Sequence, residues 1–285
     1  MPFGRAAPCC DVPRPVVQRV DVPPLPVVAT IRTFALWLFL AIFAPAYAAS
    51  PLDLEGREEK PPRLIGLTSH DGDRSRITVS SGFKLAPLGR LDREGFRLLA
   101  LATTAINEEN PITLRRANRL LGVRALVGYE WHRNNGAISL YLGPSLVTHD
   151  PASAVIAGKR KRMGAAVLAD YWQNWNAEGG RPASYTQGTV VIDQAQKSVY
   201  FKVKHGFLTG WRGLSLGPEL SVSYGQRERQ RGVVLQDEWR KLRLGLHLSG
   251  FEVTRWLVIG LAGGTEVARN ARRAGYLTLS TLVRY

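Results

Sequence analysis

Residues 241–249 read KLRLGLHLS, and their alternation determines the fold class that we expect. Leucines occupy every even position, and polar or small residues occupy every odd one. A period of two fits a β-strand, whose successive side chains point to opposite faces, and does not fit the 3.6-residue period of an α-helix. The stretch therefore predicts a strand with one apolar face and one polar face.

The same alternation recurs along most of the chain. It is clear in residues 214–224 (LSLGPELSVSY) and in residues 276–285 (YLTLSTLVRY), and weaker in residues 77–83, 96–102, 123–131, 138–142, 163–171 and 199–203. Short turn signals at 133–136, 209–213 and 252–255 alternate with longer polar segments at 149–159, 226–237 and 268–275. Amphipathic strands joined alternately by short turns and long loops are typical of an antiparallel transmembrane β-barrel.

A barrel is the form that a membrane-spanning sheet must take. Bilayer hydrocarbon offers no hydrogen-bond partners, so the sheet has to close on itself, with apolar side chains toward lipid. Eleven strands can be counted, but a barrel with both chain ends on the periplasmic side needs an even number. We therefore predict twelve strands, with ten as the second choice, and residues 63–70 or 113–120 as the missed strand. The terminal aromatic residue Tyr285 is also typical of outer-membrane barrels.

The N-terminal region has the organisation of an export signal. Arg32 precedes an apolar run at 34–43, which is too short to cross the ~30 Å hydrocarbon core as a helix. Ala46-Tyr47-Ala48 follows it, so we expect a signal peptide over residues 1–48, cleaved after Ala48. Residues 1–30 are either an extended N-terminus or the result of a start codon placed too early. Residues 49–74 would be a periplasmic tail or a weak first strand, and residues 75–285 the barrel.

Composition narrows the function classes. The 285 residues carry a net charge of +15, and 45% are hydrophobic, which excludes a wholly disordered chain. Both cysteines, Cys9 and Cys10, lie in the predicted leader, so a disulfide framework is excluded. An exported chain does not normally meet nucleic acid. The basic excess favours phosphate groups of lipopolysaccharide, or simply solvated loops, at these candidates: Arg227, Arg229, Arg231, Arg269, Arg272 and Arg273.

The opposite strand faces would line a lumen. Ionic lumen groups are expected at Arg124, Glu130, Glu219, Lys241, Arg243 and Arg284, and His205 and His247 are expected to hydrogen-bond there. Candidates for glycan or lumen contacts are Tyr141, Glu219, Lys241, Arg243, His247 and Tyr276. Tryptophans gather near predicted strand ends, where aromatic girdles lie in membrane barrels: Trp131, Trp172, Trp175, Trp211, Trp239 and Trp256.

Signals for catalysis are weak. His149-Asp150 has no neighbouring residues that complete a triad or a ligand set, and no nucleophile elbow or phosphate-binding loop occurs. We therefore predict no catalytic residues, no metal and no cofactor.

Several short motifs resemble the BcsS family of cellulose biosynthesis proteins. They are residues 128–131 (GYEW), 138–144 (ISLYLGP), His149-Asp150, 216–219 (LGPE), 243–250 (RLGLHLSG) and 275–280 (GYLTLS). The resemblance spans about residues 75–285 and implies an outer-membrane protein associated with cellulose or a related exopolysaccharide. It supplies no catalytic residues. The segments 159–162 and 226–231 are more basic than the family would lead us to expect.

The sequence is compatible with three kinds of protein. The leading one is a non-enzymatic outer-membrane barrel that supports cellulose or exopolysaccharide secretion or surface attachment. The second is an outer-membrane enzyme that modifies lipid A or phospholipid, with His247 or His149 in its site. The third is a soluble periplasmic β-sandwich, in which the leucines of residues 242–248 would point into a dry protein interior.

Overall fold

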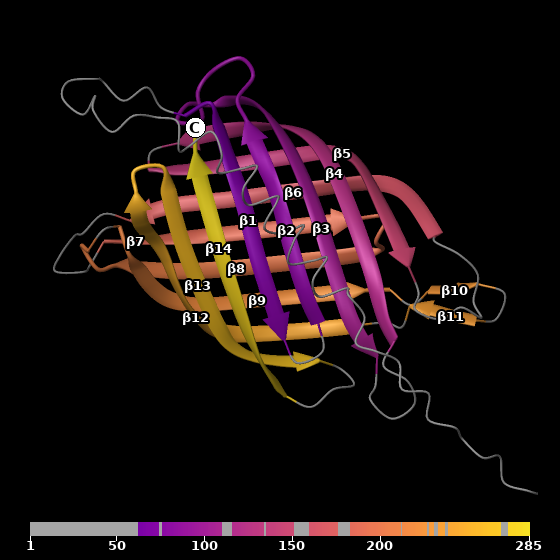
Figure 1. Cartoon of the computed structure of the whole chain (residues 1–285). Helices are drawn as coiled ribbons and strands as arrows, with labels where there is room; N and C mark the ends of the chain where they lie inside the picture. The colour runs from indigo at the N-terminus through magenta and orange to yellow at the C-terminus, as the bar shows by residue number, and fades with distance from the viewer. Residues whose placement is uncertain are drawn as a thin grey trace, which may run out of the picture. The chain divides into compact units, whose positions relative to one another are not determined.

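The computed structural model describes an all-β unit. The described residues are 62–73, 76–109, 116–133, 135–150, 160–175, 183–211, 213–226, 228–230, 233–236, 239–268 and 273–285. Twelve antiparallel strands close into a barrel, as Figure 1 shows, in the order β1-β14-β13-β12-β9-β8-β7-β6-β5-β4-β3-β2. The predicted fold class and the predicted count of twelve are thus confirmed.

The barrel strands are long enough to cross a bilayer when tilted. Their bounds are β1 (Leu64–Asp73), β2 (Arg76–Leu85), β3 (Gly95–Glu109), β4 (Arg116–Arg133), β5 (Gly136–Asp150), β6 (Arg160–Trp175), β7 (Ser184–Asp193), β8 (Ser198–Leu208), β9 (Ser215–Gly225), β12 (Trp239–Thr254), β13 (Leu257–Ala268) and β14 (Ala274–Arg284). A separate two-stranded sheet of β10 (Glu228–Gln230) and β11 (Val233–Gln236) interrupts the connection from β9 to β12.

The first and last strands close the barrel. β1 pairs with β14 from Ile65 opposite Arg284 to Asp73 opposite Tyr276, and the Tyr285 amide donates to the Leu64 carbonyl at 3.0 Å. The strand missing from the count of eleven is therefore β1, inside the segment 49–74. The described part of the other candidate, residues 116–120, belongs instead to the start of β4.

Antiparallel order assigns every connection to one of two ends. The short turns after β4, β8 and β12 lie at the end that carries Tyr285, here called the C-terminal end, and so does the long connection between β6 and β7. The connections after β5, β9 and β13 lie at the opposite end, here called the loop end. This distribution matches the one expected from the turn signals.

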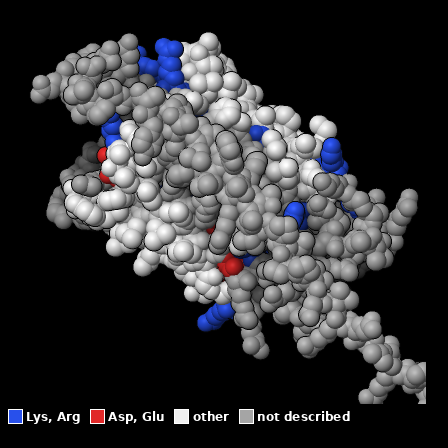
Figure 2. Space-filling model, viewed as in Figure 1, with Lys and Arg blue, Asp and Glu red and all other residues white. Residues whose placement is uncertain are grey.

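The outer wall is apolar. The leucines of β12 that were expected to face lipid are between 40% and 61% exposed: Leu242, Leu244, Leu246 and Leu248. On β5 the equivalent outward residues are Ile138, Leu140 and Leu142, also exposed. Described atoms on the face in Figure 2 are mostly uncharged. A closed barrel with its large apolar side chains outside is incompatible with the soluble β-sandwich reading.

In the part of the chain that the structure describes, no helix is long and apolar enough to span a bilayer.

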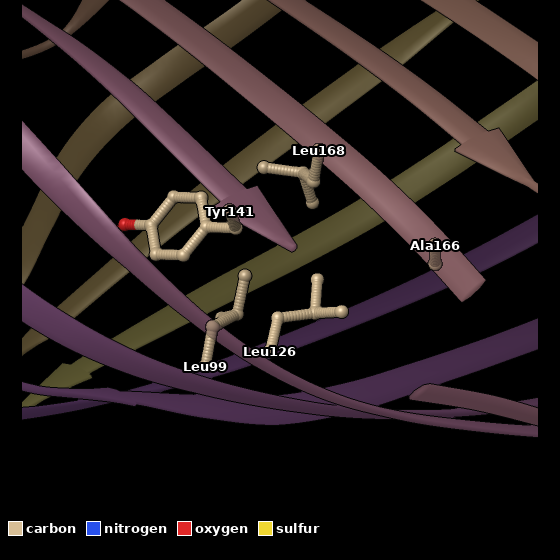
Figure 3. Close-up of a cluster of buried hydrophobic side chains, with 5 residues drawn as sticks. All are labelled: Leu99, Leu126, Tyr141, Ala166 and Leu168. Carbon is tan, nitrogen blue, oxygen red and sulfur yellow. The ribbon is translucent and has the colours of Figure 1, made fainter. Parts of the chain in front are cut away.

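Part of the lumen is filled by side chains. Leu99, Leu126, Tyr141, Ala166 and Leu168 project inward from β3, β4, β5 and β6 and face one another in Figure 3. A second buried cluster lies on the same side of the barrel and consists of Ala105, Leu120, Val147 and Ala195. We call this part of the lumen wall, β3 to β6, the apolar side.

Candidate functional site in the lumen

The opposite wall carries a network of buried charges, which we call the ion-pair cluster. Arg243 on β12 contacts Asp71 at 2.7 Å and Glu266 at 2.6 Å. Lys241 contacts Asp73 at 2.9 Å and Glu266 at 2.7 Å. Because β13 and β14 separate β12 from β1, the pairs to Asp71 and Asp73 bridge two intervening strands across the concave wall.

Sequence parity explains why these charges meet. Lys241 and Arg243 share the odd, inward parity of β12, and Arg243 is the register partner of Glu266 on β13. The Arg243 guanidinium also lies 4.9 Å from the centre of the Tyr276 ring, within the range of a cation–π contact. Each buried charge thus has an opposite partner, which a low-dielectric interior requires.

Further ion pairs lie on the apolar side itself and on its neighbouring strands. Glu130 on β4 is contacted by Lys84, by Arg97 at 3.5 Å and by His132 at 2.9 Å, and Ser139 donates to it at 3.1 Å. Asp193 on β7 accepts from Arg124 at 2.6 Å. The lumen roles expected for Arg124 and Glu130 therefore correspond to structural ion pairs.

A hydrogen-bonded aromatic group lies toward the C-terminal end. The Tyr185 hydroxyl lies 3.0 Å from Nε2 of His247 and 2.5 Å from the Ser249 hydroxyl. Its ring stacks on Trp172 with the centroids 4.5 Å apart and the planes inclined by 7°. These contacts link β7 to β12 across β8 and β9.

A cavity of about 190 Å³ lies in the lumen, lined by residues of β1, β7 to β9 and β12 to β14. Its ionisable lining residues are Lys202, Lys204, Glu219 and His247. The Lys202 ammonium lies 2.8 Å from the Glu219 carboxylate. The lining also includes hydroxyl and amide side chains of Ser69, Gln187, Thr189, Ser249, Thr278 and Ser280.

Comparison with known proteins assigns the family. Residues 68–285 match the family model described as "Cellulose biosynthesis protein BcsS". The chain belongs to the BcsS family. No curated protein matches this BcsS-family chain.

Solved structures resemble the BcsS-family barrel in fold alone. The COG4313 outer membrane channel from Pseudomonas putida F1 is 14% identical, with a TM-score of 0.54, covering 83% of this chain and 100% of the channel. The translocator domain of autotransporter NalP from Neisseria meningitidis is 10% identical, with a TM-score of 0.47, covering 91% and 98%. LpxR from Salmonella typhimurium is 10% identical, with a TM-score of 0.47, covering 78% and 100%.

The six glycan or lumen candidates all face inward, but they do not form one site. Tyr141 belongs to the apolar cluster. Lys241, Arg243 and Tyr276 belong to the ion-pair cluster or contact it. Glu219 and His247 line the cavity. Glycan binding by these residues stays a prediction.

Most of the lipopolysaccharide candidates lie outside the described residues. This applies to Arg227, Arg231, Arg269 and Arg272, and to the side chain of Arg229. Arg273 is described and exposed beside the start of β14. Arg284 shares the parity of the lumen-facing residues of β14 and pairs with Glu252 in a largely exposed contact at the C-terminal end.

Two aromatic positions differ from expectation. His205 has the outward parity of β8: its Nδ1 lies 3.0 Å from the Thr186 hydroxyl, and its ring meets Phe207, itself exposed. His205 is therefore not a lumen residue. Trp172 has the inward parity of β6 and stacks on Tyr185, although it is partly exposed, and Trp131, Trp175 and Trp211 are exposed, as girdle residues would be.

Several interior residues escaped prediction. Asp71 and Asp73 lie in a segment first assigned to a tail or a weak strand, so their partnership with Arg243 could not be anticipated. Lys202 and Lys204, in contrast, alternate with the apolar residues Val199, Phe201 and Val203. This alternation predicts that both lysines face the lumen. Among the described residues, no group of three or more His, Cys, Asp or Glu residues is placed to hold a metal ion.

Proposed function

We propose that this BcsS-family barrel resides in the outer membrane and supports the biosynthesis, secretion or surface attachment of cellulose or a related exopolysaccharide, without itself catalysing a reaction. The observation that carries the proposal is the closed barrel with an outward leucine stripe on β12, in a chain that belongs to this family. Such a wall is stable only where hydrocarbon covers it.

The arrangement of the lumen charges supports a non-enzymatic role. Arg243, Lys241 and Glu130 are all engaged in ion pairs, which suits them to hold the wall together. The side chain that meets His247 Nε2 is the phenol of Tyr185, which also bonds to the Ser249 hydroxyl, so these polar groups partner one another within the wall.

The rival function, modification of lipid A or phospholipid, fits the geometry less well. Acyl chains would contact the outer wall, whereas His247 is buried on the lumen side. His149 lies near the end of β5, at the loop end. A lipid-modifying site built on His247 would therefore need its substrate to leave the bilayer and enter the lumen.

Lipopolysaccharide phosphates are the proposed lipid partners of the loop end. Arg273 supports this, because its exposed guanidinium stands beside the start of β14, where the strand meets the connection from β13.

Deletion of the gene tests the proposal. We expect the barrel in the outer-membrane fraction, with heat-modifiable gel mobility, and we expect the deletion to reduce cellulose dye binding while leaving lipid A unchanged. Complementation with the wild-type gene should restore dye binding. Normal cellulose together with altered lipid A would reject the proposal in favour of the enzyme.

A further inference from the structure

The lumen cavity contains one more cation than anion among its ionisable lining residues. Lys202 and Lys204 face the single carboxylate of Glu219, and that carboxylate lies 2.8 Å from Lys202. Among the described residues, the contact seen for the Lys204 ammonium is the Tyr185 ring, whose centre is 5.8 Å away. Such a contact is weak beside a charge-assisted hydrogen bond. Lys204 therefore has capacity for an anion.

The neighbouring charges do not supply that anion. Asp71 and Glu266 are held by Arg243, and Asp73 is held by Lys241. The carboxylates of the ion-pair cluster are thus already bonded to cations of the same cluster. The cluster lies beside the cavity, because Asp71 is two residues along β1 from the lining residue Ser69. Glu219 is the register partner of Lys204 but is bonded to Lys202, so an anion bonded to Lys204 itself would come from a ligand.

The rest of the lining indicates what such a ligand carries. Hydroxyl and amide groups line much of the cavity. Among the described residues, no hydrogen-bond partner is seen for the side chains of Ser69 or Gln187. These groups suit a molecule with many hydroxyls. The volume of about 190 Å³ leaves room for at least one sugar ring.

We infer that this cavity binds a sugar-sized polyol with one acidic group, whose carboxylate or phosphate pairs with the Lys204 ammonium while its hydroxyls meet Ser69, Gln187 and Ser280. The inference goes beyond the proposed role in cellulose biosynthesis, because cellulose itself is neutral. Binding can be measured on the purified barrel whatever the phenotype of the gene deletion.

Isothermal titration of the detergent-purified barrel tests the inference. The probes are D-glucuronate, D-glucose 6-phosphate, D-glucose and inorganic phosphate. We expect at least one of the two acidic sugars to bind at least tenfold more tightly than both glucose and phosphate, because only an acidic sugar satisfies the ammonium and the hydroxyl groups together. The tighter of the two identifies the acidic group.

Variants separate the Lys204 contact from general effects. Lys204→Met should weaken binding of the acidic sugar about tenfold or more, Lys204→Arg should retain most of it, and Lys197→Met should bind like the wild type. Lys197 is a matched control because it is exposed in the turn of the same β7–β8 hairpin. Heat-modifiable mobility confirms that each variant is folded.

Three results would overturn the inference. They are acidic sugars that bind no better than glucose, inorganic phosphate that binds as tightly as either sugar, and a folded Lys204→Met variant with wild-type affinity.

Discussion

The two sides of the lumen bury inward-facing side chains with different chemistry. On β3 to β6, Leu126, Leu168 and their neighbours pack together in an apolar cluster. On β1, β12 and β13, Arg243 and Lys241 meet three carboxylates, and a cavity remains beside them. The contrast teaches that side-chain packing and ion pairs such as Arg97–Glu130 fill the lumen together on the apolar side, whereas the opposite side relies on charge pairing. Space for a ligand remains on the charged side, where packing is incomplete.

The largest difference between the two sides should appear when a charge is removed. Arg243→Met removes the cation that pairs with Asp71 and leaves Glu266 with Lys241 alone, so we expect the free energy of unfolding to fall by about 3–5 kcal/mol, measured by urea titration in detergent. Arg284→Met is the control: its pair with Glu252 is largely exposed and should contribute at most about 1 kcal/mol. Equal losses in the two variants would show that the ion-pair cluster does not stabilise the barrel.

On the apolar side, truncation should act through a cavity. Leu126→Ala removes a side chain that is 3% exposed inside the barrel, and we expect a loss of about 2–5 kcal/mol in the same titration. Leu246→Ala on the outer wall should cost less, because detergent or lipid fills the space that it leaves. If Leu246→Ala proved the more damaging, the assignment of inner and outer faces would be wrong.

The outer wall could be predicted from the sequence because it follows a local rule. Leu242 to Leu248 alternate regardless of which strands flank them, so the strand, its two faces and the barrel class all follow from parity. The turn signals predicted which connections between strands are short and which are long. A barrel with both ends on one side of the membrane needs an even number of strands, so one strand was missing from the count of eleven. The sequence did not decide between residues 63–70 and 113–120 for that strand.

The interior could be predicted only in part, because it depends on register. Parity placed Arg243 inside, but its partner Asp71 comes from the opposite end of the sequence and meets it only through barrel closure between β1 and β14. β1 itself alternates poorly, since Gly66, Thr68 and His70 stand where apolar residues were expected. Tyr185 and Trp172 likewise stack only because β6 and β7 pair in one particular register.

The most direct test of the central claim is the environment of each residue of β12 in a bilayer. The chain after Ala48 contains no cysteine, so single cysteines at 242, 244, 246 and 248, and at 241, 247 and 249, can carry a fluorescent label. We predict that spin-labelled lipid quenches the label at the four even positions and leaves it largely unquenched at the three odd ones. Quenching without this alternation, or confined to the odd positions, would contradict a barrel whose leucine face meets lipid.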